Sequence, residues 1–369
     1  MALFAVLTIG CHSSQYVVYA PGENLQALTK VTDGENKCDY PFGGDNGKDL
    51  FFAVHDKNNM ISNIYRKENP FTASMNQKTS GKNQNLSPTF CAATDKLAFS
   101  GLLEGSIMRD IYMIDVSQGH ALTQITNTPY AAENHPFISR DGRILVYDRV
   151  ANTGRAGDTE IWTKNLQTNE NTMLGLGFMP SFSPDGRTIT FVRFTTDGNK
   201  SCIWIMDTNG DNQIQVTDAN MGFVSHPRFS PDGRYIVFQC SKRDKKDFDL
   251  YVIDRNGNDL TQLTINKSYD GEPYWSNDGY IYFTSDRGGR DRHYQIWRFK
   301  YGIMASTTVR TSASKVEVVT PSGYHTVRQG ETITQIAQKY GVTTRDIVKW
   351  NALQTMTLTP GMRLKISAQ

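Results

Sequence analysis

A short motif recurs six times along this chain of 369 residues, and its spacing constrains the fold more than any other feature. Four copies have a proline followed three positions later by Ser-x-Asp-Gly, and two earlier copies are degenerate. The six prolines are Pro41, Pro88, Pro136, Pro180, Pro227 and Pro273. Neighbouring prolines lie 44 to 48 residues apart. Such a period indicates that one supersecondary unit is repeated, as in solenoids and propellers.

Each repeat predicts four strands. An aromatic strand leads into a turn such as Ser-Pro-Asp-Gly at 183–186, in which proline presets φ, Asp bonds the backbone beyond it and Gly takes φ > 0. An alternating strand such as 235–238 follows, and then a third strand such as 249–254. A turn with Asn-Gly leads to a fourth strand that ends at Leu-Thr, as at 263–264. Four strands in each of six repeats predict an all-β, six-bladed β-propeller over residues 11–300.

The ends of the predicted propeller indicate how the ring closes. The sixth repeat stops at residues 297–300 without a fourth strand of its own. Residues 25–29, with the sequence LQALT, carry the pattern of that missing strand. We therefore predict that the N-terminal segment completes blade six, which leaves only short, protected strand edges.

The repeats also resemble a known family. The pattern Phe/Trp-Ser-x-Asp-Gly-x-x-Ile-x-Phe, followed by Ser-Asp-Arg-Gly-Gly at 285–289 and by Ile-Trp, is similar to the TolB-like (PD40-type) propeller repeat, a WD40-like repeat. The resemblance covers roughly residues 16–300. It implies the propeller fold much more firmly than a particular function, because blades of this type occur in many proteins.

The amino-acid composition of the chain changes after the predicted propeller. Residues 301–322 are rich in Ser, Thr and Ala and predict a linker. Residues 323–369 predict a small βααβ domain with a strand at 324–328, a helix from 332, a second helix from 344 to about 351 and a final strand at 362–366.

This C-terminal unit resembles a LysM domain through Tyr-His-Thr-Val-x-x-Gly-Glu-Thr-Ile at 324–333 and Trp-Asn-x-Leu at 350–353. The resemblance implies binding of glycans that contain N-acetylglucosamine, such as peptidoglycan or chitin. The glycan contacts carried over by motif are Gly330, Glu331, Thr332, Ile333, Asn351, Ala352 and Leu353. The alternative is that Ile333 and Leu353 are only core residues and that Glu331 only favours the helix N-terminus.

The N-terminus has the pattern of an export signal. Residues 2–10 are apolar, and Cys11 follows Gly10 directly. A short apolar segment that ends in a small residue is typical of a secretory signal in residues 1–10. The Gly-Cys step resembles the bacterial lipobox, which implies lipid attachment at Cys11. An ordinary cleaved signal and a buried first strand are the alternatives. The chain has no run of about 18 apolar residues, so no transmembrane helix is predicted.

The remaining cysteines and the histidines carry little sign of metal chemistry. Four cysteines lie far apart without a C-x-x-C pair, which favours small buried side chains over zinc ligands. These are Cys38, Cys91, Cys202 and Cys240. His135 and His226 both directly precede a repeat proline, so they occupy equivalent positions in two blades. Equivalent positions can project towards a shared axial channel, but a repeated structural role is the simpler interpretation, and we expect no metal and no cofactor.

The sequence also restricts the reaction classes. No G-x-S-x-G, H-E-x-x-H or G-x-x-x-x-G-K motif is present, so no catalytic residue is predicted. A formal net charge of only +2 argues against a nucleic-acid partner.

The expected function is therefore that of a non-catalytic protein of the bacterial cell envelope. It would lie in the periplasm as an outer-membrane lipoprotein, hold peptidoglycan through its LysM domain, and present the propeller to another envelope protein. The first alternative is a propeller enzyme, a glycan- or lactone-acting hydrolase that the LysM domain targets to the wall. Acidic or histidine side chains clustered at the channel would favour it. The second alternative is a secreted, unlipidated protein that binds chitin-like glycans.

Overall fold

The computed structural model describes residues 25–367 of the chain. The positions outside the description in this range are 45–47, 73, 119–120, 152–155, 242–246, 290–291, 302–322, 329–330, 332, 334–335, 337–339, 341, 343 and 354–357. Apart from one α-helix and two 3-10 turns, the described regular elements are β-strands. This confirms the predicted all-β propeller fold.

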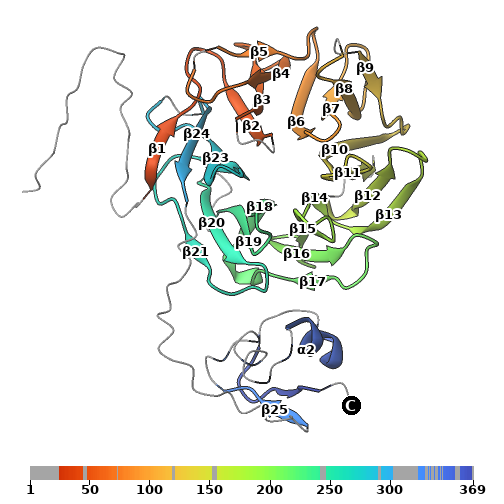
Figure 1. Cartoon of the computed structure of the whole chain (residues 1–369), viewed down its shortest axis with the longest axis vertical. Helices are drawn as coiled ribbons and strands as arrows, with labels where there is room; N and C mark the ends of the chain where they lie inside the picture. The colour runs from red at the N-terminus through yellow and green to blue at the C-terminus, as the bar shows by residue number, and fades with distance from the viewer. Residues whose placement is uncertain are drawn as a thin grey trace, which may run out of the picture.

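The strands form antiparallel sheets arranged in a ring around a central axis (Figure 1). Three sheets each contain four strands that follow one another in the chain. They are β10 (Ala131–Ile138), β11 (Ile144–Ala151), β12 (Thr159–Asn165) and β13 (Asn171–Leu176); β14 (Phe178–Phe182), β15 (Thr188–Phe194), β16 (Ser201–Asp207) and β17 (Ile214–Gln215); and β18 (Phe223–Phe229), β19 (Tyr235–Ser241), β20 (Asp249–Asp254) and β21 (Thr261–Gln262).

A fourth sheet contains eight strands from the first part of the chain. They are β2 (Cys38–Gly43), β3 (Leu50–His55), β4 (Ser62–Lys67), β5 (Asn76–Gln77), β6 (Gln84–Cys91), β7 (Lys96–Leu102), β8 (Asp110–Asp115) and β9 (Leu122–Gln124). Its two halves are joined by one parallel pair, Ser62 with Gln84. The 3-10 turns are η1 (Ala156–Asp158) and η2 (Ala219–Met221).

The last propeller sheet combines the two ends of the repeat region. It contains β22 (Asp270–Trp275), β23 (Tyr280–Ser285), β24 (Gln295–Lys300) and, on the far side of β24, β1 (Gln26–Lys30). Thr29 of β1 lies opposite Arg298, and Lys30 lies opposite Trp297. At the centre of the ring each inner strand contacts the next, and β22 contacts β2, so the circle is continuous.

The turn chemistry predicted from the motif is present in the structure. Asp185 accepts hydrogen bonds from the Ser183 hydroxyl and the Arg187 N–H, and Asp232 accepts the equivalent bonds in the next repeat. Gly186 has φ of +66° and Gly233 has φ of +70°, a region that disfavours other residue types. The same residues therefore fold the same way in successive repeats.

The core lies between and within the sheets and consists of the inward-facing residues of the alternating strands. Four cysteines contribute to it: Cys38, Cys91, Cys202 and Cys240 are all free and buried. This confirms their predicted role as small apolar side chains. No described helix has the length and apolar character needed to cross a membrane.

The C-terminal unit contains β25 (Tyr324–Thr326), α2 (Thr344–Asn351) and β26 (Arg363–Lys365). The two strands pair antiparallel, with His325 opposite Leu364. The second helix and both strands therefore lie where the sequence predicted them. The first predicted helix falls largely on positions outside the description.

Candidate functional site

The inner strands share an unusual backbone feature at the axis of the ring. In each of them the residue before the repeat proline has a positive φ of 46° to 54° and interrupts the regular pairing with the next strand. These residues are Tyr40, Ser87, His135, Met179, His226 and Glu272. The left-handed conformation costs a non-glycine residue about 1 kcal/mol, and a bulge re-aims the side chain. We call these six residues the axial layer.

The two histidines singled out in the sequence meet in this layer. The ring centroids of His135 and His226 are 5.7 Å apart, and the ring of Tyr40 lies 6.0 Å from that of His226. Among the residues that the structure describes, no group of three His, Cys, Asp or Glu side chains is arranged to hold a metal ion. The two equivalent positions therefore lie together at the axis, which is the possibility that the sequence left beside the simpler one of a repeated structural role.

Hydrogen bonds across the axial layer join one sheet to the next. Asp148, which is 1% exposed, lies 2.7 Å from His135 Nδ1 and accepts a 2.7 Å bond from the Met179 N–H of the following sheet. The Glu272 N–H donates to Gln239 of the preceding sheet at 2.6 Å. At these bulges, backbone N–H groups therefore donate hydrogen bonds to side chains of neighbouring sheets.

Glu272 is the carboxylic acid of the axial layer, and its surroundings shift its pKa. Its carboxylate accepts from the Tyr40 N–H at 3.0 Å and from the Thr284 hydroxyl at 2.7 Å. Burial, followed by the charge of Asp39, raises the pKa of Glu272 to about 7. A carboxyl group with such a pKa changes charge near neutral pH, which makes it a candidate for proton transfer as well as for structure.

His226 contributes a buried imidazole ring to the axial layer. Both ring nitrogens are buried, and neither has a hydrogen-bond partner among the described residues. Burial, followed by the electrostatic effects of nearby His135 and Arg228, holds the pKa of His226 well below its usual value. The ring is therefore neutral at pH 7 and borders a cavity of about 20 Å³, room for one water molecule, together with Tyr40 and Glu272.

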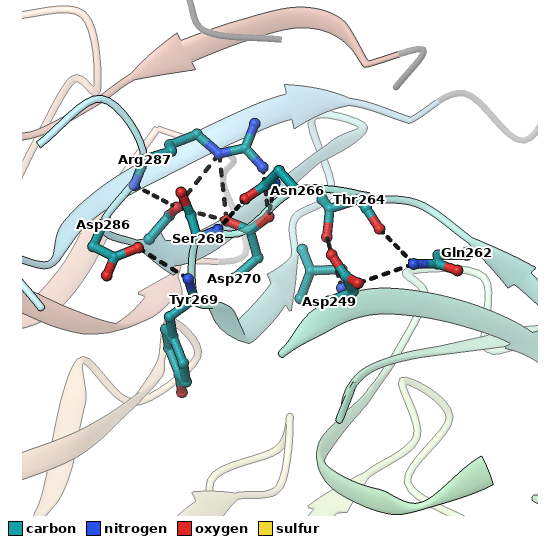
Figure 2. A network of polar contacts seen from close by, with 11 residues as sticks. Asp249, Gln262, Thr264, Asn266, Ser268, Tyr269, Asp270, Asp286 and Arg287 are labelled. Carbon is teal, nitrogen blue, oxygen red and sulfur yellow. Dashed lines mark hydrogen bonds and ion pairs between the residues drawn. The ribbon is translucent and has the colours of Figure 1, made fainter. Parts of the chain in front are cut away.

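A second polar cluster supports the layer from the side. Figure 2 shows the buried ion pair of Arg287 with Asp270, to which the Ser285 hydroxyl and the Asn266 amide also donate. Burial, followed by the charge of Asp270, raises the pKa of nearby Asp249 to about 7. The cluster fixes the 285–289 loop.

The same loop positions a tyrosine next to the axial layer. Asp286 accepts from the Tyr269 N–H at 2.9 Å, and the Tyr269 hydroxyl lies 3.4 Å from Glu272. Only the loop motif was visible in the sequence; its partner Asp270 was not, since no spacing pattern links the two.

The predicted glycan contacts of the C-terminal unit differ in burial and in hydrogen bonding. Cys11, Gly330 and Thr332 lie outside the described residues. The Glu331 carboxylate lies 2.8 Å from His325 Nε2 and accepts from the Arg328 N–H at 2.7 Å. Ile333 is fully buried and packs in one apolar cluster with Leu353. For Ile333 the surroundings match the alternative that it is a core residue.

The other predicted contacts lie at the end of α2. The Asn351 amide donates to the carbonyls of Ile347 and Lys365, and its oxygen accepts from the Lys365 N–H at 2.7 Å. This side chain is therefore used to hold β26 against the helix. Ala352 follows it, exposed and with φ of +47°, and Leu353 is half-buried. Among the described members of the predicted set, Ala352 is exposed, whereas Glu331, Asn351 and Leu353 are half-buried.

Comparison with curated proteins gives a short match. Over 47 residues the chain is 45% identical to membrane-bound lytic murein transglycosylase D of Escherichia coli strain K12. The match spans 13% of this chain and about a tenth of the length of the relative.

Comparison with solved structures finds proteins whose fold is similar to the propeller of this chain. The putative TolB from Agrobacterium tumefaciens is similar with a TM-score of 0.57 and 18% identity, over 75% of this chain and 97% of that one. TolB from Acinetobacter baumannii has a TM-score of 0.51 and 17% identity, over 73% and 65% of the two chains. An oligogalacturonate lyase in complex with manganese has a TM-score of 0.53 and 16% identity, over 78% and 96%. At such identities these likenesses concern the fold alone.

The sequence itself provides the family. A protein-family model, described as the TolB beta propeller domain (PD40), matches the sequence over residues 174–362, which is more than half of the chain. This protein therefore belongs to the TolB-like β-propeller family.

Proposed function

We propose that this protein is a non-catalytic component of the bacterial cell envelope, held on peptidoglycan by residues 323–369 acting as a LysM domain. Its propeller, in which the eight-stranded sheet counts as two of six blades, binds another envelope protein. The observation that carries the proposal is the 45% identity over 47 residues to an enzyme whose name states that it acts on murein. Segment 323–369 has the same length, and we assign the match to it.

The surroundings of the predicted glycan contacts are compatible with this role. Asn351 and Glu331 fix the frame of the C-terminal unit, while Ala352 and Leu353 remain accessible next to backbone groups at the end of α2. The N–H groups of Ala352 and Leu353 donate within the unit, to the carbonyls of Lys349 and Val348. In this proposal the acetamido group of the glycan therefore donates to a backbone carbonyl of the segment, and its methyl packs against apolar side chains. The basic residues of the unit favour approach to anionic wall polymers.

The axial layer supports a structural rather than a catalytic propeller. Asp148 is occupied by contacts with His135 and Met179, and Glu272 by contacts with Tyr40 and Thr284. Groups used in this way join neighbouring blades and offer few free atoms to a substrate. A protein-binding role needs only the rigid surface that these bonds maintain.

The test is co-sedimentation of the full chain with purified peptidoglycan sacculi. We expect the wild type to pellet with sacculi and Ala352→Glu to bind at least tenfold more weakly, because a charged side chain would replace a small apolar one among the predicted glycan contacts. Ala93→Glu makes the same change at an exposed turn of the propeller and should bind like the wild type. A wild-type protein that stays in the supernatant would refute wall anchoring.

The envelope location includes a lipid anchor at Cys11 in this proposal. Incorporation of labelled palmitate into the wild type, and its absence from Cys11→Ser, is the expected result. Label in neither protein would favour the secreted, unlipidated alternative.

A propeller enzyme, a glycan- or lactone-acting hydrolase, is the second candidate. Glu272, with a pKa of about 7, and the unpartnered ring of His226 border the same small cavity, and this pairing favours acid–base chemistry. Release of soluble fragments from sacculi by the wild type, but not by Glu272→Gln, would establish it. Without release by either protein, the non-catalytic proposal stands.

A further inference from the structure

A second cavity opens on the face of the propeller that carries the Ser-x-Asp-Gly turns. Its volume is about 90 Å³, and residues of all four such turns, Arg140, Pro184, Pro231 and Asn277, border it. Seven aromatic residues contribute to its wall. The ring centroids of Phe42 and Phe137 are 5.5 Å apart at its base. Aromatic and apolar walls with a few polar groups are typical of small-ligand sites.

Arg228 is the unusual polar group of this cavity. It follows Pro227 in β18 and lies over the Phe137 ring at 5.3 Å. Its one hydrogen bond is to the neighbouring Pro227 carbonyl at 3.2 Å, and no carboxylate pairs with it among the described residues. The cavity lining contains no Asp or Glu, whereas it contains a second arginine, Arg140.

The guanidinium of Arg228 is therefore a half-buried charge without a paired carboxylate among the described residues, and Glu272 lines the small axial cavity that Arg228 also borders. Burial lowers its pKa to about 10, so it remains charged at neutral pH. A charge that is removed from water without a partner is energetically unfavourable. The Arg228 guanidinium is such a charge, and it lines a cavity with aromatic walls. An anion that enters the cavity supplies the missing partner.

We propose that this cavity binds a small organic acid, with its carboxylate on Arg228 and its apolar body against the aromatic wall. Guanidinium groups pair with carboxylates in a bidentate, charge-assisted manner. The small volume favours a free acid over the C-terminus of a peptide. This site is independent of the proposed wall anchor and is formed by propeller residues alone.

The test uses the full chain with phenylacetate and with phenylacetamide, its neutral analogue, in calorimetric titrations and thermal melts. We expect phenylacetate to bind at least tenfold more tightly than the amide and to raise Tm, because it binds only the folded state. Arg228→Met should lose the preference for the acid, and Arg228→Lys should keep part of it. Arg187→Met, which removes an exposed charge from the same face, should bind like the wild type.

The alternatives give different results. If Arg228 serves only to pack on Phe137, Arg228→Met lowers Tm and the wild type binds acid and amide alike, which overturns the proposal. No Tm shift in the wild type with tens of millimolar phenylacetate overturns it as well. N-acetylphenylalanine binding tenfold more tightly than phenylacetate would assign the cavity to a peptide C-terminus instead of a free acid. Should Arg228→Met fail to fold, the wild-type comparison and Arg228→Lys decide.

Discussion

The backbone N–H of Tyr40 donates a 3.0 Å hydrogen bond to the carboxylate of Glu272, 232 positions later in the chain. The two residues occupy the same place in the first and last inner strands, so the bond closes the ring at its axis. The pairing of β1 with β24 closes the ring a second time, at its side. A propeller joined at two separate radii resists opening between its first and last blades more than one joined at a single strand.

Glu272→Gln should make the stability of the protein less sensitive to a rise in pH from acidic to neutral values. The folded pKa of about 7 exceeds the ordinary value of 4.5, so the folded state holds the proton more tightly than the unfolded state. The wild type therefore loses stability as pH rises from about 4.5 through 7. The glutamine keeps acceptors for Tyr40 but cannot ionise. Urea unfolding at pH 5 and pH 8 should show a gain for the variant that is larger at pH 8.

The exposed Glu104→Gln is the control for this comparison, and we expect the same difference from the wild type at both pH values. Asp249 and Glu133 also have pKa values raised to about 7 by burial, so the wild type alone shows a compound pH dependence. Only the difference between variant and wild type isolates Glu272. An equal effect of Glu272→Gln at the two pH values would contradict the assigned environment.

Thr32→Val should weaken the closure between β1 and β24. The Thr32 hydroxyl accepts from the buried Ile296 N–H at 2.8 Å and donates to Gln295 at 2.7 Å. Valine has a similar shape but leaves that N–H without an acceptor, which costs about 1–3 kcal/mol of unfolding free energy. Chemical denaturation measures this loss. Thr29→Val, whose hydroxyl only donates to Ala27 in an exposed site, should change stability little, and equal losses would argue against closure at Thr32.

Arg287→Met should destabilise the protein strongly, whereas the double variant Asp270→Leu with Arg287→Met should regain much of the loss. Both side chains are almost completely buried. Removing one partner leaves an uncompensated buried charge, which costs about 3–5 kcal/mol, but replacing both with apolar groups removes the cost of burying charge. A double-variant cycle by denaturation measures the coupling. Additive losses would show that the pair is not the main interaction of Arg287.

The repeat architecture could be predicted from the sequence because each turn and strand of a repeat depends on residues that are close together in the chain. A turn such as 183–186 needs only its own Pro, Asp and Gly, so its hydrogen bonds follow from residue type and spacing. The strands could be predicted for the same reason, because apolar and polar residues alternate along them. The position of His135 and His226 before repeat prolines likewise showed that their side chains could meet, since repetition places equivalent residues at equivalent radii, although a repeated structural role was the simpler interpretation.

The environment of the axial side chains was not predictable in this way. Glu272 owes its raised pKa to burial and to Asp39, and Asp270 meets Arg287 across a loop. Neither relationship has a sequence pattern, because each depends on packing between repeats. The buried state of Ile333 also follows from packing that a motif match does not report.

Asn351→Ala should loosen the C-terminal unit without touching the propeller. The Asn351 side chain makes three hydrogen bonds, two of them to the backbone of Lys365 in β26, and their loss leaves buried backbone groups unpaired. Hydrogen exchange of the full chain should therefore accelerate at residues 363–365 and remain unchanged in β10–β12. Lys349→Ala, an exposed change on the same helix, is the matched control. Because Ala352→Glu leaves those three bonds intact, it should reduce sacculus binding without accelerating exchange, whereas Asn351→Ala should do both. If Asn351→Ala leaves exchange at 363–365 unchanged, the side chain is free for ligand contact, and its assignment to the frame is wrong.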